Sequence, residues 1–545
     1  MHDNKVLDSP ITSSMREDLT IKTQEGKTYV GAIDIGTNST HLLIASVDLT
    51  LKTFSIELAE KSTTRLGEKE YGSGDLTDIA VTRVIKTLKR FKDIADSYKV
   101  KELITYATSA VREAPNRNNF LNLVKSEVNI DIELISGTEE ARLIYLGVLS
   151  GMEFGEKPHL IIDIGGGSTE LILADANDAI ALTSTKIGAV RLKRDFFNNK
   201  KNELRETHFL QTFIRGSLEP AVDKIRRRIK PNEKHLMIAT SGTAMAIGSL
   251  IDDKHSIGKG KHHGMKISKN KLDNLVEKLI NYSPDQLKKI TSISDRRSEI
   301  IIPGALILQT SMRMMNIDEV VLCERALREG MVVDWMFRKG LFQSKYNFQG
   351  NIRERTVFHQ AKRFMVDTKR SRRVAKHALE IYDQTFGLLH FDKGEGRNLL
   401  WAAAILHSCG QHINLAAYHK HSWYLIRHGE LLGYSRGEHL MVAGIARYHR
   451  KSFPKKRHEA WQCLITKEQK EIVAKMSIIL RLAKSIDKRP DPAVDKIRVD
   501  NSKTGLKLKL VPEISNQNID LELWNLNKSL ETCRDFLDID ITIDC

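Results

Sequence analysis

The 545-residue sequence contains few cysteines, prolines and aromatic residues. Its five cysteines are scattered and include no Cys-x-x-Cys pair, which argues against a disulfide framework or a zinc site and favours a reducing compartment. Eleven prolines and 33 glycines exclude a collagen-like or Pro/Gly-rich disordered chain. Hydrophobic residues still make up 41% of the chain, enough to pack about three to four domains.

Long apolar runs are also missing. Residues 1–27 are polar, without the apolar stretch that a signal peptide needs, and we expect a flexible tail there. No run approaches the ~18 apolar residues of a membrane-spanning helix. We therefore expect a cytoplasmic protein without an integral membrane segment; peripheral association with a membrane stays open.

The positive charge is concentrated in one segment. Lys and Arg outnumber Asp and Glu by 85 to 69, a formal net charge of +16. Positions 345–490 hold 28 Lys/Arg, 12 Asp/Glu and 11 of the 19 histidines, and the rest of the chain carries 57 charges of each sign. Such a surplus predicts affinity for polyanions and assigns it to this segment.

The pattern of apolar residues divides the chain behind the tail into four parts. Residues 28–146 and 147–340 alternate strand and helix patterns, which predicts two α/β domains with mixed sheets. Residues 345–490 have an almost entirely helical pattern. Residues 491–545 include three stretches that alternate like strands, 495–500, 505–514 and 519–526, and predict a small β-rich C-terminal unit.

A seven-residue loop pattern occurs twice, as Asp34-Ile-Gly-Thr-Asn-Ser-Thr40 and Asp163-Ile-Gly-Gly-Gly-Ser-Thr169, with five identical residues at an offset of 129. Glycine lets backbone N–H groups approach a phosphate, hydroxyl side chains add donors, and a strand-end Asp can hold a divalent cation. The repeat predicts two related halves facing one another. A third loop, Ala239-Thr-Ser-Gly-Thr243, opens a helix and is either an anion site or an ordinary Ser/Thr cap.

Several motifs together resemble one family. DIGTNSTHLLIA, TSAVREA, ISGTEEARLIYLGV, LIIDIGGGSTELIL, ATSGT and ALREG closely resemble the exopolyphosphatase / guanosine pentaphosphate phosphohydrolase family, and bacterial exopolyphosphatases most of all. The resemblance implies a duplicated actin-like (ribonuclease H-like) fold with its active site in the cleft between the halves. It also implies metal-dependent hydrolysis of the terminal phosphoanhydride of inorganic polyphosphate, or of guanosine pentaphosphate as the alternative substrate.

The resemblance assigns roles to individual residues. Glu140 falls on the family's catalytic base, whereas Glu139 fits a capping box with Ser136 and is expected to be structural. Arg112 could clamp phosphate oxygens, although a solvated arginine at a helix start would look the same. The predicted metal-binding residues are Asp34, Asp163 and Glu170, with Mg²⁺ as the metal and K⁺ as a further activating ion; the predicted substrate-binding residues are Asn38, Ser39, Gly165, Gly166, Gly167, Ser168, Thr169, Ser241 and Gly242.

Two positions depart from the commonest family pattern. Thr40 precedes His41 where the family often has Phe, and Arg325 precedes the ALREG motif where Gly is frequent. Neither touches the proposed base, so we expect them to affect substrate preference and not the class of reaction.

The basic segment resembles the family's helical HD-like domain. His407 is followed by Ser408 where a metal-binding HD site would have Asp, so we expect most of these histidines to be structural or to face an anion. The recurring Lys and Arg could line a groove for polyphosphate. Nucleic acid would also fit the charge, but sparse aromatic residues and the lack of a stacking motif argue against a specific nucleic-acid partner. By family resemblance we expect a homodimer.

Two further classes of function stay open at this stage. A sugar-kinase-like phosphotransferase would share the fold and transfer phosphate to an organic acceptor. A non-catalytic nucleotide or polyanion sensor would use the loops for binding only.

Overall fold

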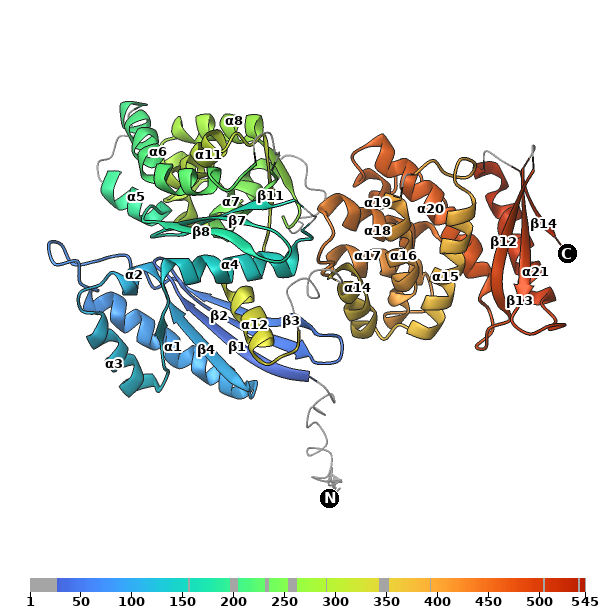
Figure 1. Cartoon of the computed structure of the whole chain (residues 1–545), viewed down its shortest axis with the longest axis horizontal. Coiled ribbons are helices and arrows are strands. Elements are labelled where there is room, and N and C mark those ends of the chain that lie inside the picture. Colours follow the sequence, from blue (N-terminus) through green and yellow to red (C-terminus); the bar gives the residue numbers. More distant parts are fainter. Residues whose placement is uncertain are drawn as a thin grey trace, which may run out of the picture.

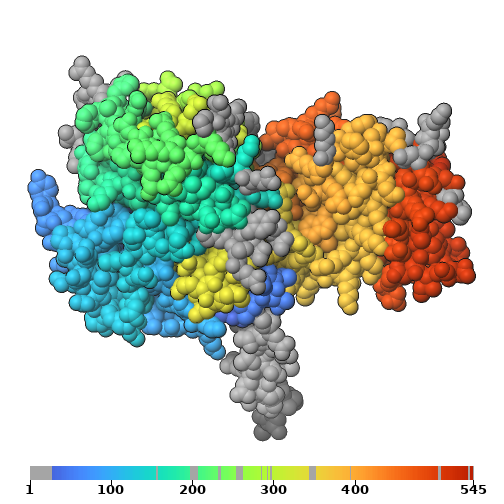
Figure 2. Space-filling model, viewed as in Figure 1, coloured from blue at the N-terminus to red at the C-terminus, as the bar shows by residue number. Residues whose placement is uncertain are grey.

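The structure is a computed structural model that describes residues 27–154, 157–196, 204–230, 235–252, 262–290, 292–342, 352–392, 394–502, 505–537 and 540–544. The predicted tail lies outside the described residues except for Lys27, which begins the first strand. Two α/β domains lie together, and a helical domain and a small terminal sheet extend to one side of them (Figures 1 and 2). No described helix is both long and apolar enough to cross a membrane.

The first domain is built on a five-stranded sheet in the order β3-β2-β1-β4-β5. Residues of β1 alternate between two cores: Ile33 and Ile35 pack with α1 and α3, whereas Val30 and Ala32 pack with α4 and α12. β1 therefore lies in the middle of the domain, covered on both faces. The elements are β1 (Lys27–Ile35), β2 (Thr40–Asp48), β3 (Thr53–Ser62), α1 (Asp78–Ser97), β4 (Glu102–Ala107), α2 (Ser109–Arg112), α3 (Arg117–Val128), β5 (Glu133–Leu134) and α4 (Gly137–Gly151).

The second domain repeats this topology. Its sheet has the order β10-β11-β9-β6-β7-β8, so that β6, β7, β8, β9 and β11 take the places of β1 to β5. The predicted duplication is therefore confirmed as a duplicated sheet. The elements are β6 (His159–Ile164), β7 (Thr169–Ala174), β8 (Ala179–Thr185), α5 (Ala189–Phe196), α6 (Leu204–Arg226), β9 (Met237–Thr240), α7 (Ser241–Asp252), β10 (Lys266–Ser268), α8 (Lys269–Ile280), α9 (Pro284–Lys288), α10 (Asp295–Ser298), α11 (Ile301–Met314) and β11 (Glu319–Leu322).

The two domains share a pair of helices. α12 (Leu327–Arg338) follows the last strand of the second domain but returns to pack against α4 and β1 of the first, as Figure 1 shows. The boundary expected between residues 146 and 147 falls inside α4. The chain therefore crosses between the domains twice, at α4 and at the start of α12.

The basic segment folds as helices, as its pattern predicts. Its core also contains residues of the terminal sheet, including Ile497 and Leu508, so the helical and terminal parts share one hydrophobic cluster. The helices are α14 (Ile352–Arg363), α15 (Thr368–Gln384), α16 (Glu395–Leu406), the 3-10 turn η2 (Cys409–His412), α17 (Tyr418–His428), α18 (Arg436–Tyr448), α19 (Glu459–Gln462) and α20 (Lys467–Ile486).

The terminal unit corrects one prediction. Strands 495–500 and 505–514 appear as β12 (Val494–Ser502) and β13 (Gly505–Pro512), with β14 (Asp540–Asp544) beside β13, but the strand predicted at 519–526 is wrong. That stretch begins α21 (Asp520–Cys533), which a 3-10 turn, η3 (Arg534–Phe536), follows. The alternating leucines suggested a strand, whereas burial recurs every three or four residues at Glu522, Leu526, Leu530 and Cys533.

Candidate active site

The two repeated loops form matching turns at the ends of equivalent strands. Gly36 N–H donates to the Ser39 carbonyl across 3.1 Å, and Gly165 N–H donates to the Ser168 carbonyl across 3.0 Å. In each hairpin the strand-end Asp pairs with the residue seven positions later, Asp34 with His41 and Asp163 with Glu170. The repeated sequence has therefore folded into repeated geometry.

The two loops lie in direct contact, which explains a glycine in the second copy. A Cβ atom on Gly167 would come within 2.7 Å of Thr37 Oγ1 and of Ser109 Oγ, both from the first domain. A larger residue would therefore push the domains apart.

A cavity of about 410 Å³ lies between the two domains at these loops. The structure brings most of the predicted site residues to it: Asp34, Asn38, Ser39, Glu140, Asp163, Gly165, Gly166, Gly167, Ser168, Ser241 and Gly242. Three predicted residues do not line it, namely Arg112, Thr169 and Glu170. Thr169 is fully buried, and its hydroxyl donates to the Ile187 carbonyl at 2.7 Å, so it is held inside the fold.

Glu140 stands on the first turn of α4 and is buried at the wall of the cavity. Arg112 Nη1 donates to Glu140 Oε2 at 3.2 Å and to the Ile135 carbonyl at 2.8 Å, so the arginine reaches the carboxylate from behind. Burial, and then the charge of Glu170, raise the pKa of Glu140 well above its usual range. A base with a raised pKa is suited to taking a proton from water near neutral pH.

Glu139, next in the chain, has a different surrounding. Its backbone N–H donates to Ser136 Oγ at 3.1 Å, but its carboxylate accepts from Arg142 at 2.7 and 2.8 Å instead of closing the capping box. Arg142 also pairs with Asp334 of α12. Glu139 therefore helps to join α4 to α12, and only one half of the predicted capping box forms.

The other predicted carboxylates have raised pKa values. Burial and repulsion from Glu140 and Asp34 raise the pKa of Asp163 to about 7. Burial, opposed by Arg328, raises the pKa of Asp34 to about 6. Burial and the charge of Asp163 raise the pKa of Glu170 to about 8, although Ser184 Oγ donates to its carboxylate at 2.8 Å. Negative charge is thus crowded in this part of the fold.

Two of the three predicted carboxylates are placed to bind a divalent cation. Asp34 Oδ1 is buried without a hydrogen-bond partner, and Asp163 shares the cavity with it. Glu170 lies behind the cavity wall, and the described residues contain no group of three His, Cys, Asp or Glu side chains able to hold a metal. The predicted three-carboxylate set is therefore not preformed, whereas Asp34 and Asp163 suit Mg²⁺, which keeps waters and takes oxygens from substrate phosphates.

Cationic and imidazole side chains that the sequence reasoning did not assign line the same cavity: His41, Lys61, Arg297 and Arg328. Arg328 belongs to the ALREG motif, and His41 is the repeat partner of Glu170, so both left a signal in the sequence. Arg297 left none: it lies more than 50 residues after Gly242, on which its guanidinium packs so closely that a Cβ there would come within 1.8 Å of Nη2.

The third loop is both a cap and part of the cavity wall. Ser241 has a positive φ of 91°, and its hydroxyl accepts from the N–H groups of Thr243 and Ala244 at 3.1 and 3.4 Å. The hydroxyl therefore caps α7, while Ser241 and Gly242 still line the cavity. The cap that the sequence offered for this loop is therefore present, and the anion site stays a prediction.

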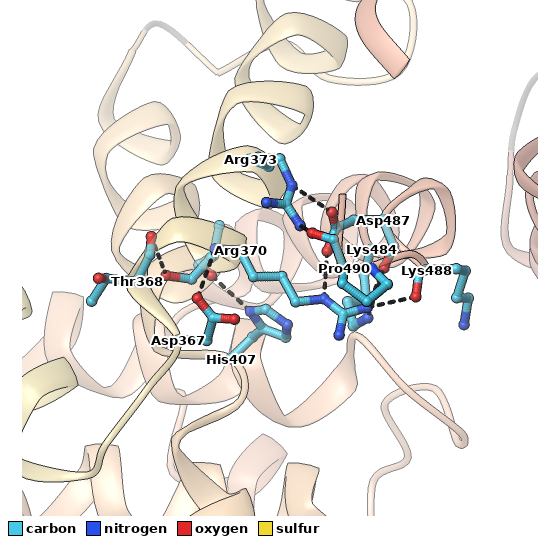
Figure 3. Close-up of polar contacts among 11 residues, drawn as sticks. Asp367, Thr368, Arg370, Arg373, His407, Lys484, Asp487, Lys488 and Pro490 are labelled. Atoms are coloured by element: carbon cyan, nitrogen blue, oxygen red, sulfur yellow. Dashed lines mark hydrogen bonds and ion pairs between the residues drawn. The ribbon is translucent and has the colours of Figure 1, made fainter. Parts of the chain in front are cut away.

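In the histidine-rich helical domain, two arginines pair with Asp487, a carboxylate that could otherwise coordinate a metal ion. Figure 3 shows Arg370 and Arg373 of α15 directed at Asp487, at the end of α20, with Nε–O distances of 2.7 and 2.9 Å. His407 lies nearby and contacts the Ala404 carbonyl through Nδ1 at 2.7 Å. Because both oxygens of Asp487 are used by guanidinium groups, this carboxylate is neutralised from within the protein.

Comparisons with known proteins agree with this geometry. Residues 43–339 match the Ppx/GppA phosphatase family, and residues 352–529 match domain III of Ppx/GppA phosphatases. An exopolyphosphatase 1 from Mycobacterium leprae (strain TN) is 30% identical over 305 residues, which cover 56% of this chain and 88% of the relative. A guanosine-5'-triphosphate,3'-diphosphate pyrophosphatase from Vibrio vulnificus (strain YJ016) is 28% identical over 420 residues, 77% of this chain and 80% of the relative.

A solved structure has the same fold as the two catalytic domains. The crystal structure of an exopolyphosphatase from Cytophaga hutchinsonii superposes with a TM-score of 0.53 at 26% identity, covering 57% of this chain and 98% of the other. The family match spans more than half of the chain and contains Glu140 and Asp163, whereas Asp34 lies a few residues before the match begins. The chain is a phosphatase of the Ppx/GppA family.

Proposed function

We propose that the protein is an exopolyphosphatase that removes orthophosphate from the end of inorganic polyphosphate. The observation that carries the proposal is the position of Glu140: a buried carboxylate with a raised pKa at the wall of a cavity that two phosphate-type loops also line. Phosphoryl transfer to water needs a positioned base, donors to the phosphate oxygens and positive charge, and the cavity supplies each of these.

In this reaction Glu140 takes a proton from a water molecule while the water oxygen bonds to the terminal phosphorus. The bond from that phosphorus to the bridging oxygen breaks, releasing orthophosphate and a chain one unit shorter. Backbone N–H groups of Gly166 and Gly167 orient the phosphate oxygens, and Arg297 and Arg328 offset the charge that develops. Mg²⁺ held by Asp34 and Asp163 would add neutralising charge at the phosphate oxygens.

The test is a pair of neighbouring variants. Glu140→Gln should abolish phosphate release from polyphosphate and leave polyphosphate binding intact, because the amide cannot accept the proton. Glu139→Gln is the matched control and should stay active, since its carboxylate contacts Arg142 and not the cavity. Wild-type turnover in Glu140→Gln would refute the assignment. Binding without any release by the unaltered protein, with every divalent metal tried, would favour the sensor alternative.

Guanosine pentaphosphate is the second candidate substrate, because relatives of similar identity carry the pyrophosphatase name. The localised surplus of positive charge in residues 345–490 favours the longer anion. Phosphate release should be compared for tripolyphosphate, long polyphosphate and guanosine pentaphosphate at several salt concentrations. Long polyphosphate should be preferred at low salt and lose its advantage as salt rises. Equal release from short and long chains would count against this choice.

We also propose that the helical domain is an HD-like fold that binds polyanions and performs no chemistry. Ser408 in place of an acidic residue, and Asp487 taken up by two arginines, support that interpretation. A cytoplasmic homodimer activated by K⁺ completes the proposal. Its checks are the mass in solution and phosphate release with K⁺ exchanged for Na⁺.

A further inference from the structure

Arg325 lies between the cavity and the helical domain. It is in the short segment that joins β11 to α12, where its neighbours Glu324 and Ala326 line the cavity, as does Arg328 on the first turn of α12. Its own side chain is only 3% exposed and does not line the cavity. A buried arginine needs partners, and these lie in three other parts of the fold.

The partners of Arg325 come from α4, β3 and the helical domain. Nη1 donates to Ser150 Oγ at 3.1 Å, and Nη2 lies 3.5 Å from Oε2 of Glu430. The guanidinium stacks over the ring of Phe54, 4.4 Å from its centre. Glu430 is fixed in turn, because its carbonyl accepts from Thr356 Oγ1 at 3.0 Å.

The end of α4 is tied to the same place. The Gly151 carbonyl accepts from the N–H of Gly433, in the helical domain, at 3.0 Å. His263 Nε2 also lies 3.0 Å from the Gly151 carbonyl, and its Nδ1 accepts from the N–H of Glu324 at 3.3 Å. The last turn of α4 and the segment before α12 are therefore joined to each other and to the helical domain.

The closely packed helices α4 and α12 also carry residues of the active site. α4 bears Glu140 on its first turn and Ser150 near its end. A Cβ atom on Gly147 would come within 1.9 Å of the Ala326 carbonyl oxygen, and one on Gly330 within 1.8 Å of the Leu143 carbonyl oxygen. Backbones this close cannot slide independently, so a shift at Arg325 must move α4 and Glu140 with it.

We propose that Arg325 is a positioning residue for the phosphatase reaction, which holds Glu140 and the cavity segment 324–328 in register with Glu430 of the helical domain. The inference deepens the proposed function and rests on it. It also gives the helical domain a means of acting on the catalytic base, through α4.

The first experiment measures kcat and KM on tripolyphosphate for Arg325→Met, Glu430→Gln and the double variant. We expect Arg325→Met to lower kcat by about tenfold with little change in KM, because a displaced base impairs the chemical step. The double variant should lose no more than Arg325→Met alone, since both changes break one contact. Arg325→Lys should recover part of the loss. Wild-type kcat in Arg325→Met, or losses that multiply in the double variant, would overturn the proposal.

A matched control and a second readout separate positioning from general loss of structure. Arg436→Met breaks another ion pair of the helical domain, with Asp252 of α7 at 3.0 Å, and should leave kcat unchanged. Hydrogen exchange needs no activity: in Arg325→Met, amides 323–330 and 429–435 should both exchange faster. Unchanged exchange would refute the contact itself, whereas a wild-type protein that releases no phosphate would refute only the proposed function.

Discussion

Arg112 donates a hydrogen bond to the carboxylate of Glu140 across 3.2 Å from the side away from the cavity. Burial, and then the charge of Glu170, raise the pKa of Glu140, and Arg112 lowers it. The sequence left Arg112 as a phosphate clamp or a solvated arginine, and its contact with Glu140 adds a role in tuning and orienting the base.

Arg112→Met should therefore shift the activity of the enzyme to higher pH. Removing the guanidinium raises the pKa of Glu140 further, so a smaller fraction is deprotonated at pH 7. The acidic limb of the pH profile of kcat/KM should move to higher pH, with a loss of about ten- to a hundredfold at pH 7 that partly recovers at pH 9. A profile lowered equally at every pH would mean that Arg112 acts on the phosphate. The control is Arg117→Met, whose guanidinium donates to the Arg112 carbonyl and to no carboxylate of the described residues.

The buried carboxylates should make the metal-free protein less stable as the pH rises. The folded-state pKa values of Asp163 and Glu170, about 7 and about 8, lie above their unfolded values, so these groups favour the folded state at low pH. That contribution is lost as the pH rises through these values. Melting temperatures measured between pH 6 and pH 9 should fall, and Mg²⁺ should restore more stability at pH 9 than at pH 6.

Asp163→Asn isolates this effect from other titrating groups. Buried histidines such as His407 have the opposite effect. Burial lowers the pKa of His407 to about 4, so this residue makes the folded state less stable as the pH falls below about 6.5. Lys484, with a pKa lowered to about 8, acts mainly above that pH. These contributions cancel when the variant is compared with the wild type at each pH. A melting curve with the same pH slope in both proteins would contradict the prediction.

Two glycine substitutions test the close packing of α4 on α12. Gly147→Ala would place a methyl group 1.9 Å from the Ala326 carbonyl oxygen, so we expect a loss of a few kcal/mol in the free energy of unfolding. Gly216→Ala, inside α6, meets no atom within 4 Å and should be neutral or stabilise by up to about 1 kcal/mol. Thermal or urea unfolding of the two variants gives the comparison, and equal stabilities would refute the close contact.

Much of the site could be predicted because its loops are local in sequence. Each repeated motif contains the strand end, the turn and the next strand, so the seven residues from Asp34 or from Asp163 determine their own geometry. Arg297 could not be found this way, since only the tertiary fold brings it onto Gly242. The side from which Arg112 approaches Glu140 likewise depends on the Ile135 carbonyl, which is distant in sequence.

The limits of periodicity explain the error at the C-terminus. Residues 519–526 are too short to separate a period of 2 from one of 3.6. The helix becomes recognisable only when Leu530 and Cys533 are included, because they continue the spacing from Glu522 and Leu526. The buried Glu522 also looks out of place until its partner is known: Arg489 donates to it at 2.9 Å.

The arginine pair on Asp487 leads to a last prediction. The Asp487 side chain is 5% exposed and holds Arg370 and Arg373 at once. Asp487→Ala would leave two guanidinium groups facing each other without a carboxylate, so we expect a loss of about 3 kcal/mol in the free energy of unfolding. Asp383→Ala, which breaks the exposed pair with Arg397, should cost less than about 1 kcal/mol. Because a guanidinium pair occupies the carboxylate, a chelator should change neither value; a chelator-sensitive unfolding of the wild-type helical domain, absent in Asp487→Ala, would instead show that Asp487 binds a metal.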